Sequence, residues 1–416
     1  MKSFVKRILP KQVFALYHFL LALTGALRYR FPSQKLVVIG VTGTKGKSSV
    51  AELVNAILEE AGYTTALLST IRFKVGDESR PNLLKMTMPG RFFVQRFLFD
   101  ATHAGCTHAV IEMTSEGVTQ FRHRFIDLDA LIFTNIAPEH IESHGSFENY
   151  LAAKLKLRDA LEASLKENTA MIANTDDAHG KDFLNVSHAT PIPFSLSDVT
   201  FRSKENGVSL SYKDIDINSK LKGAFNAYNI LAAIKLGEYL NIPLETIRRG
   251  IENVSVIPGR VEHIHKGQMF DVVIDYAHTP DSLCALYDAF DGKRKVCVLG
   301  NTGGGRDTWK RPEMGKIADR ACDVVILTNE DPYDEDPEKI VREMAAGMER
   351  EPSIIMDRRE AIREAIENAA RDPRNTAVLI SGKGTDPFIM EANGKKTSWS
   401  DKRVAEEELA RILPNA

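Results

Sequence analysis

The sequence lacks any cysteine arrangement that would suggest a metal or disulfide motif. Its four cysteines, Cys106, Cys284, Cys297 and Cys322, are scattered, without a C-x-x-C pair. This spacing argues against a zinc ribbon and against a disulfide framework, and it fits a protein of the reducing cytoplasm. We therefore expect a cytoplasmic location.

The sequence also lacks an excess of basic charge and any low-complexity or short-period repeat. Lys and Arg together number 54 and Asp and Glu 56, which gives a formal net charge of −2. A nucleic-acid-binding protein needs basic groups to replace the counterions of the phosphate backbone, so we expect no nucleic-acid partner. With 416 residues and 43% hydrophobic content, the chain has the composition of a globular protein with two or three domains.

No apolar run in the sequence has the length of a membrane span. The longest candidate, residues 13–27, has basic flanks at Lys6, Arg7, Lys11, Arg28 and Arg30. A spanning helix needs about 20 residues, and no small-residue cleavage site of a secretory signal follows. Two placements remain open: a helix docked on the body of the protein, and a helix in the membrane interface with its basic flanks on anionic lipid.

The most informative motif lies at residues 36–49, LVVIGVTGTKGKSS. A buried-strand pattern leads into a glycine-rich turn, which ends in Gly-Lys-Ser at the start of an apolar-periodic helix. The backbone N–H groups of such a turn cradle phosphates, while Lys47 would reach the terminal phosphates and Ser48 would ligate Mg²⁺. The strict G-x-x-x-x-G-K-[ST] pattern needs glycine at Val41, so only its second half is matched. The turn predicts a nucleoside triphosphate site.

Short β-branched runs alternate with helical patterns on both sides of a break near residues 255–260. We expect strands at 36–41, 64–70, 108–114, 130–136, 271–277, 295–300, 323–329, 353–357 and 376–382. Helices are expected from Lys47 to Gly62, at 336–348 and at 358–370, and a polar section at 194–217 alternates like antiparallel strands. This pattern is typical of mostly parallel sheets covered by helices on both faces, with a ligand cleft between two domains.

Polar residues gather where these strands end. Glu112 closes the strand at 108–114, from where a carboxylate can reach a phosphate-bound Mg²⁺, since an unpaired buried charge is seldom kept for packing. The stretch TNIAPEHIESHG places Glu139, His140, Glu142 and His144 after the next strand, and Lys154 lies on the helix that follows.

In their order along residues 36–416, these motifs resemble the Mur ligase family, most closely its UDP-N-acetylmuramoyl-tripeptide synthetase type. The stretches that carry the resemblance are VTGTKGKSS, IEMTSEGVTQFRHR, FTNIAPEHIESHGSFENYLAAK, LKGAFNAYNILAA, IPGRVE, VVIDYAHTPDSL, GGGRDTWKRPEMG, NEDPYDEDP and SGKGTDPF. The resemblance implies a segment 1–35, a central ATP-binding P-loop domain 36–256 with a mostly parallel sheet, and a C-terminal Rossmann-like α/β domain 257–416 that binds the amino acid.

The resemblance also assigns roles to individual residues. The implied ATP-binding residues are Gly43, Thr44, Lys45, Gly46, Lys47, Ser48, Ser49, Asn226, Arg260, Asp275 and His278. The implied acceptor-binding residues are Thr87, Thr114, Gln120 and Arg122, and the implied amino-acid-binding residues are Arg306, Asp331, Pro332, Tyr333, Gly382 and Asp386. Lys47, Glu112, His140 and Lys154 would be catalytic, with Lys154 carbamylated.

The implied reaction is ATP-dependent amide synthesis on a UDP-MurNAc-peptide or related cell-wall precursor, through an acyl phosphate and with release of ADP and phosphate. Two Mg²⁺ ions would be held, one by Ser48 and Glu112 and the other by His140 and Lys154. An unmodified lysine has no free lone pair for a metal, whereas its carbamate offers the oxygens that Mg²⁺ prefers. We expect a monomer whose partners are these small-molecule substrates, with peripheral membrane contact through the N-terminal helix left open.

The sequence departs from the family pattern at several places. Lys45 replaces the usual asparagine, Glu116 stands at a usual histidine, and about 35 residues take the place of the family's UDP-gripping domain. Tyr333 replaces the arginine of the D-N-P-R motif of diaminopimelate-adding enzymes, and Glu330, Asp331 and Asp334 make this loop acidic, which favours a cationic amino acid such as lysine. The alternatives are a folylpolyglutamate-synthetase-like or other Mur-type ligase with a non-UDP, even lipid-linked, acceptor, and a membrane-associated ATP-binding protein without ligase activity.

Overall fold

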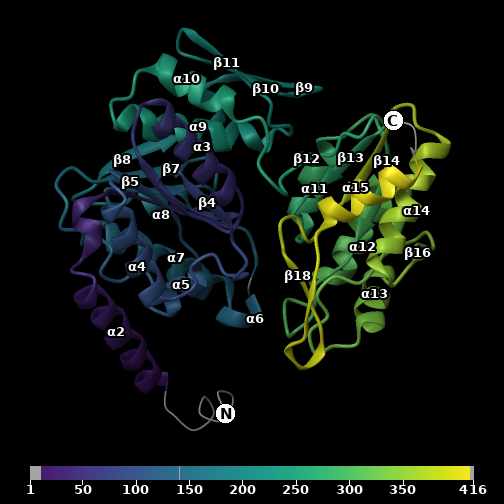
Figure 1. The fold of residues 1–416 in the computed structure, drawn as a ribbon, viewed down its shortest axis with the longest axis horizontal. Helices are drawn as coiled ribbons and strands as arrows, with labels where there is room; N and C mark the ends of the chain where they lie inside the picture. The colour runs from purple at the N-terminus through teal and green to yellow at the C-terminus, as the bar shows by residue number, and fades with distance from the viewer. Residues whose placement is uncertain (1–10, 140, 413–416) are drawn as a thin grey trace.

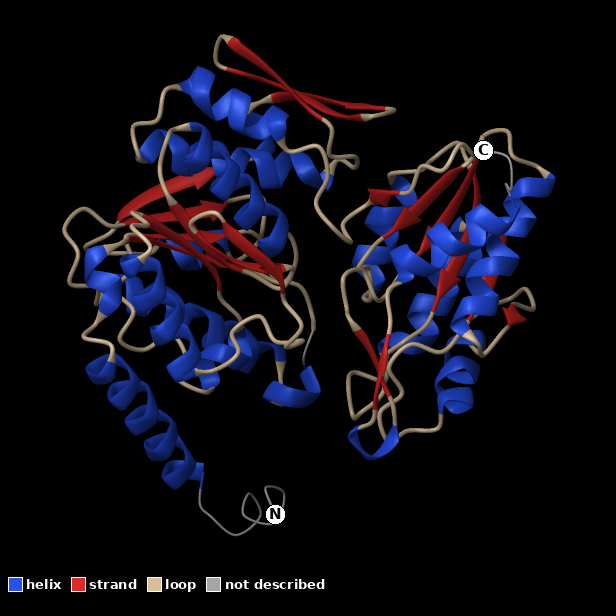
Figure 2. Cartoon of the chain, in the orientation of Figure 1, coloured by secondary structure: helices blue, strands red, loops and turns tan. Residues whose placement is uncertain are grey.

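The structure is a computed structural model that describes residues 11–139 and 141–412. It contains two α/β bodies, each built on its own sheet, and the chain passes from the first to the second after helix α10 (Leu244–Asn253) (Figures 1 and 2). The predicted fold class, a central mostly parallel sheet followed by a second α/β domain, is confirmed.

The first body contains an eight-stranded sheet in the order β4-β3-β2-β5-β1-β6-β7-β8. Its strands are β1 (Val37–Thr42), β2 (Thr65–Leu68), β3 (Arg72–Val75), β4 (Glu78–Pro81), β5 (His108–Glu112), β6 (Ala130–Phe133), β7 (Ala170–Asn174) and β8 (Thr190–Phe194). Its helices are α3 (Lys47–Glu60), α4 (Arg91–His103), α5 (Ser115–Thr119), α6 (Ile141–His144), α7 (Phe147–Glu162), α8 (Gly180–Leu184), α9 (Phe225–Tyr239) and α10. Strands β3 and β4 add an antiparallel hairpin to the edge, and the other pairs are parallel.

Alternating strand residues face two separate cores, one on each side of this sheet. Helices α3, α9 and α10 cover one face, and helices α4, α7 and α8 cover the other. The helical spacing of the apolar residues in α3 predicted its buried face, and Val50, Leu53, Val54, Ile57 and Leu58 are all buried. The parallel order brings the carboxyl ends of β1, β5 and β6 to one edge, where open α/β sheets bind their ligands.

The polar section predicted as antiparallel strands forms a small sheet of its own. It contains β9 (Thr200–Lys204), β10 (Gly207–Tyr212) and β11 (Ile215–Ser219), in the order β11-β10-β9. Its apolar side, with Val208, Leu210 and Ile217, packs into the core that α9 and α10 share. Phe194, at the start of the predicted section, belongs instead to β8 of the main sheet.

The second body is a six-stranded sheet in the order β12-β13-β17-β14-β15-β16. Its strands are β12 (Glu262–His263), β13 (Asp271–Ile274), β14 (Arg294–Leu299), β15 (Val324–Leu327), β16 (Ser353–Ile354) and β17 (Thr376–Ile380), and a two-stranded ribbon contains β18 (Phe388–Met390) and β19 (Lys396–Ser398). Helices α11 (Pro280–Asp288), α12 (Lys310–Ala321) and α13 (Pro337–Ala345) cover one face, and α14 (Arg358–Arg371) and α15 (Asp401–Ile412) the other.

One sequence expectation about the cysteines is wrong. Cys297 on β14 and Cys322, directly after α12, form a disulfide bond although 25 residues separate them. Spacing along the chain did not reveal the pair, because packing α12 on the sheet brings the two residues together. Cys106 and Cys284 are free, as the scattered spacing suggested.

The apolar N-terminal run forms helix α2 (Lys11–Arg28), which packs against α4. Ala22 and Ala26 are buried, and the ring of Phe19 lies 5.4 Å from that of Phe125. The approach to α4 is close, since a Cβ added at Gly25 would lie 3.6 Å from the Cα of Phe92. Docking on the body is therefore observed. Among the residues that the structure describes, no helix is long and apolar enough to cross a membrane.

Candidate functional site

The phosphate-loop motif forms the predicted strand–turn–helix. Strand β1 ends at Thr42, and α3 begins at Lys47 after a turn in which Gly43 and Gly46 have φ angles of +150° and +81°. A Cβ at Gly43 would lie 1.9 Å from Thr134 Oγ1, and one at Gly46 would lie 2.4 Å from Asn229 Oδ1. Only glycine fits these two positions, so the turn approaches its neighbours as closely as a phosphate-binding loop requires.

Two lysines converge on one carbonyl oxygen of this turn. Lys47 Nζ donates to the oxygens of Gly43 and Thr44, at 2.9 Å each, and Lys154 Nζ, from α7, donates to the same Gly43 oxygen at 2.7 Å. Burial lowers the pKa of Lys47, against the opposing pull of Glu112 and Glu139. Burial and the neighbouring Lys47 hold the pKa of Lys154 well below its ordinary value. Lys154 is therefore a buried amine that loses its proton easily.

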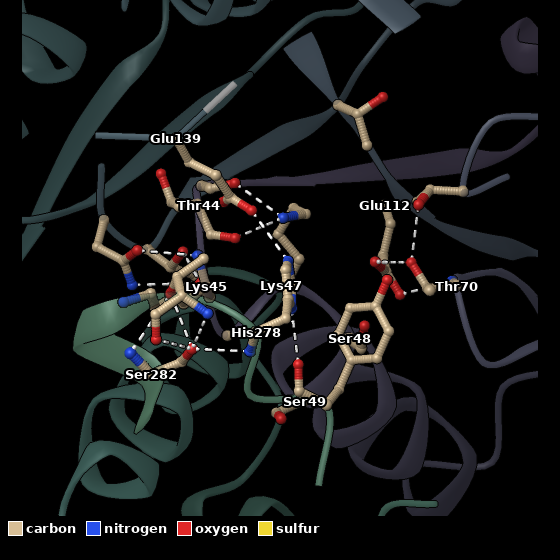
Figure 3. A pocket seen from close by; sticks show the side chains of 18 of the residues that line it. Thr44, Lys45, Lys47, Ser48, Ser49, Thr70, Glu112, Glu139, His278 and Ser282 are labelled. Atoms are coloured by element: carbon tan, nitrogen blue, oxygen red, sulfur yellow. Dashed lines mark hydrogen bonds and ion pairs between the residues drawn. The ribbon is translucent and has the colours of Figure 1, made fainter. Parts of the chain in front are cut away.

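Glu112 lies where the sequence predicted it, at the carboxyl end of β5. It is fully buried, and its two oxygens accept hydrogen bonds from the backbone N–H of Thr70 at 2.9 Å and from the Thr70 hydroxyl at 3.0 Å. Figure 3 shows Lys47 between Thr44 and Glu139 on one side and Glu112 with Thr70 on the other. A carboxylate at this place can take up a cation next to phosphate.

A cavity of about 480 Å³ joins these groups to the second body. Of the residues predicted for ATP, it is lined by Gly43, Thr44, Lys45, Gly46, Lys47, Ser48, Ser49, Arg260, Asp275 and His278, and of those predicted for metal or catalysis also by Glu112 and Lys154. His140 lies outside the described residues. No group of three or more His, Cys, Asp and Glu side chains placed to hold a metal occurs in the described part of the chain. Among the described residues predicted to bind metal, the oxygen ligands that suit Mg²⁺ are the hydroxyl of Ser48, the carboxylate of Glu112 and, if it is formed, a carbamate on Lys154.

On the nucleotide side, the predicted residue Asn226 does not line the cavity, whereas its neighbour Asn229 does. Asn226 is buried behind the wall, where its amide donates to Lys222 O and its Oδ1 accepts from Asn229. Asn229, one turn later on α9, lines the cavity beside Gly46. The adenine-side role of Asn226 stays a prediction, and Asn229 is the asparagine of α9 that faces the cavity.

Three residues of the second body, Arg260, Asp275 and His278, line the nucleotide side of the cavity, and contacts hold each of them in place. The Arg260 guanidinium lies 4.5 Å from the ring centre of Tyr276 and 3.4 Å from Ser48 Oγ. Asp275 accepts from the N–H groups of Val261 and Ala277 at 2.7 Å each, and burial raises the pKa of its carboxyl group. The ring of His278 is held by a 3.0 Å contact of Nε2 with Glu139 Oε1 across the two bodies.

The predicted acceptor residues are brought together only in part. Thr87, Thr114 and Arg122 line the cavity, whereas Gln120 does not: its Oε1 accepts from Arg122 NH2 at 2.8 Å and so orients that side chain. Arg91, the first residue of α4, donates from Nε to the backbone oxygen of Gln120 at 2.6 Å. Arg91 Nη2 and Arg122 Nε are buried without a hydrogen-bond partner among the residues that the structure describes. Arg91, which the sequence analysis did not identify, therefore lies close to the predicted Arg122, although it does not line the cavity itself.

A second cavity of about 90 Å³ adjoins the first and contains most of the predicted amino-acid residues. Arg306, Asp331, Tyr333, Gly382 and Asp386 line it, and Pro332 is buried beside them without lining it. The two cavities adjoin, because they share six lining residues: Thr70, Lys85, Thr87, Tyr276, His278 and Arg306.

Charge in this second cavity is distributed differently from the sequence expectation. Asp331 pairs with Lys383 at 2.8 Å and with Lys85, which reaches across from the first body. These cations hold the pKa of the Asp331 carboxyl below its ordinary value, although burial opposes them. Glu330 is 2% exposed, and its Oε1 accepts from Thr302 at 2.7 Å, while its Oε2 has no hydrogen-bond partner within residues 11–139 and 141–412. The negative charge of Asp331 is therefore neutralised by lysines, so the loop is not acidic as a whole. The acceptor atom that remains without a described partner in this loop is Oε2 of Glu330.

Several residues of the site were missed at the sequence level. Lys383 and Asn229 lie inside two of the family-like stretches, SGKGTDPF and LKGAFNAYNILAA, so their place in these motifs was a signal that could have identified them. Nothing in the sequence around Lys85, a loop residue with a φ of +56°, indicated a contact with a residue 246 positions away.

Family models match both bodies of the chain. The Mur ligase middle domain matches residues 41–237, and the model described as Mur ligase, glutamate ligase domain, matches residues 259–384.

Individual proteins extend this similarity over almost the whole chain. The chain is 35% identical over 390 residues to a UDP-N-acetylmuramoyl-L-alanyl-D-glutamate–2,6-diaminopimelate ligase of Aquifex aeolicus, covering 91% of this chain and 78% of that protein. A solved structure of a ligase with the same name is 27% identical, with a TM-score of 0.62 over 93% of this chain and 82% of the other. A Mycobacterium tuberculosis folylpolyglutamate synthase gives a TM-score of 0.69 over 88% and 92% of the two chains, but at 20% identity it shows the shared fold alone. The chain belongs to the Mur ligase family of ATP-dependent acid–amino-acid ligases.

Proposed function

We propose that this enzyme joins an amino acid to the peptide carboxylate of a UDP-MurNAc-peptide or a related cell-wall precursor. The observation that carries the proposal is that two adjoining cavities bring the predicted groups together: the phosphate loop and most of the acceptor residues line one, and most of the amino-acid residues line the other. At such a site the carboxylate attacks the terminal phosphoryl group of ATP, and the leaving group is ADP. The amine then attacks the acyl phosphate, loses a proton and expels phosphate, so that an amide bond forms.

The protein's own groups position the reactants and balance their charge in this scheme. Lys47 and Arg260 provide cations for the phosphates, and Arg122 provides one for the acceptor, while Arg91 supports the neighbouring Gln120 from behind the cavity wall. Bound Mg²⁺ supplies further neutralisation of phosphate charge, and the residues that fit it are Ser48, Glu112 and Lys154 as its carbamate, with His140 completing the proposed set. Two Mg²⁺ ions are proposed, one held by Ser48 and Glu112 and the other by His140 and the Lys154 carbamate.

We propose that Lys154 is carbamylated. Its amine is buried, and its low pKa favours the neutral form that can attack carbon dioxide. The reaction joins the amine nitrogen to the carbon of CO₂ and releases one proton. The product is an anion. The positive charge of the nearby Lys47 stabilises this anion, whereas it repels the ammonium form of unmodified Lys154.

The amino acid added is proposed to have a second amino group. The Oε2 atom of Glu330, which has no described partner, is suited to accept a hydrogen bond from an ammonium group. The argument for lysine or a similar amino acid therefore rests on Glu330 and no longer on an acidic loop. Tyr333 offers no bidentate grip on the second carboxylate of diaminopimelate, and its ring instead lies 5.9 Å from the Arg306 guanidinium.

Tyr333→Arg is expected to shift the preference from lysine toward diaminopimelate by roughly tenfold, because a bidentate charged hydrogen bond contributes about 1.5–3 kcal/mol. The measurement is kcat/KM for the two amino acids in competition. Tyr333→Phe is the matched control and should leave the preference unchanged. Diaminopimelate as the best substrate of the unmodified enzyme would contradict the prediction.

The proposal is tested by measuring phosphate release for a grid of acceptors and amino acids. The acceptors are muropeptides with and without a UDP group and a folate, and the amino acids include lysine, diaminopimelate and glutamate. Release that needs both a muropeptide and an amino acid supports the proposed function. Release with folate and glutamate alone would favour the folylpolyglutamate alternative, and release without any amino acid would exclude a ligase.

The remaining assignments are also proposals. We keep the monomer as a proposal, and the need for ATP supports a cytoplasmic location. The division at 1–35, 36–256 and 257–416 is kept as the proposed domain structure.

A further inference from the structure

Helix α2 is apolar on two faces, and the fold uses only one of them. The face with Ala22 and Ala26 packs on the first body, while Val13, Leu16, Tyr17, Leu20 and Leu27 are 44–57% exposed. These residues recur at intervals of three, four and seven, so they form one outer stripe along the helix. An apolar stripe of this length is expected to be covered in the working protein. Figure 1 shows the beginning of α2 extending away from the first body.

The charges around the outer stripe have one sign. Helix α2 contains no acidic residue, and no aspartate or glutamate occurs in the sequence before Glu52. Basic residues precede the stripe at Lys2, Lys6, Arg7 and Lys11 and follow it at Arg28 and Arg30. The chain as a whole has a net charge of −2, so this end of the protein is a local concentration of positive charge.

The charges discriminate between the surfaces that could cover the stripe. A dimer formed by packing α2 on α2 would place cationic helix ends against cationic or uncharged partners, because α2 has no carboxylate to offer in either orientation. An anionic bilayer offers both an apolar layer for the leucines and negative headgroups for the flanking lysines and arginines. The length of the stripe, too short for a span, suits a helix that lies in the plane of the interface.

We propose that α2 is a membrane-interface helix whose outer stripe enters an anionic lipid surface while its inner face stays docked on α4. This goes beyond the proposed ligase activity, since it assigns a binding surface outside both cavities. It also has a structural consequence for the acceptor side. Helix α4, against which α2 packs, begins with Arg91, which contacts the same Gln120 as the cavity residue Arg122. Membrane binding would therefore hold the acceptor side of the enzyme close to the bilayer.

The test is flotation of the full chain with vesicles of phosphatidylcholine, with and without phosphatidylglycerol. We expect binding only when phosphatidylglycerol is present, and release at about 1 M NaCl, where the Debye length falls to about 3 Å. Leu16→Glu combined with Leu20→Glu should reduce the bound fraction at least tenfold, and Arg28→Glu should reduce it severalfold. The matched control is Leu165→Glu combined with Met269→Glu, which introduces the same charges at residues 78% and 77% exposed elsewhere and should bind like the wild type.

Three results would overturn the proposal: no binding of the full chain to phosphatidylglycerol vesicles, unchanged binding of the Leu16→Glu, Leu20→Glu variant, or a dimer without vesicles that this variant dissociates. The last would show that a second copy covers the stripe. Phosphate release is measured on the same proteins with a soluble acceptor and should be unchanged by the outer-stripe substitutions. Absence of phosphate release in the wild type would refute the proposed ligase function and leave the membrane result to be judged by itself.

Discussion

Replacing Lys154 with alanine is expected to lower the rate of amino-acid-dependent phosphate release by roughly 100-fold or more, the usual cost of losing one preorganised charged group at a reacting centre. The side chain is 1% exposed, donates to Gly43 O and lies next to Lys47, so it belongs to the phosphate end of the cavity. A carbamate at this place would be lost together with its amine. The measurement is kcat at saturating ATP, with thermal unfolding to confirm that the variant is folded.

Three further variants and conditions separate a carbamate from a simple cation. Lys154→Arg keeps a positive charge but cannot form a carbamate, so it should be as inactive as the alanine variant. Short carboxylic acids should partly restore Lys154→Ala, whereas high bicarbonate should not, and wild-type protein in ¹³C-bicarbonate should show a carbamate carbon signal. Lys156→Ala, an exposed lysine of the same helix, is the matched control. An active Lys154→Arg enzyme would show that charge alone suffices and would contradict carbamylation.

The local parts of this structure could be predicted from the sequence because they depend on neighbouring residues. The turn at Gly43 and Gly46, the apolar face of α3 and the position of Glu112 at a strand end follow from short-range patterns. The buried strands were found for the same reason, with their ends displaced by a few residues. The order of the motifs then identified the family, and most of the residues predicted from it line one of the two cavities.

The parts that could not be predicted depend on contacts between distant segments. Lys85 neutralises Asp331 from the other body, and this contact removed the argument that the loop was acidic. Cys297 and Cys322 meet only because α12 packs on β14. The position of Asn229, rather than Asn226, at the cavity has a different origin: both lie on α9, and the rotation between them along the helix decides which side chain faces Gly46. A sequence motif can predict the helix, but the packing of that helix decides which of its side chains faces the cavity.

Lys47→Ala is expected to abolish measurable ATP turnover, again by roughly 100-fold or more, while leaving the fold intact. Its ammonium group contacts only the oxygens of Gly43 and Thr44 among the hydrogen-bond partners that the structure describes, and it lines the cavity rather than a core. The measurement is phosphate release together with ATP affinity and thermal unfolding. Lys35→Ala, an exposed lysine ahead of β1, is the control. A folded Lys47→Ala protein with near-wild-type turnover would remove the phosphate loop from the mechanism.

The same substitution also tests how the two lysines are coupled. The positive charge of Lys47 is one of the causes that lower the pKa of Lys154, so removing it should raise that pKa. A higher pKa means that the neutral amine, and hence the carbamate, forms only at higher pH. The ¹³C carbamate signal of Lys47→Ala should therefore appear at a higher pH than that of the wild type. Because both side chains donate to the oxygen of Gly43, the double alanine variant should be no slower than the slower single variant. Independent, multiplying losses would show instead that the two lysines act on separate steps.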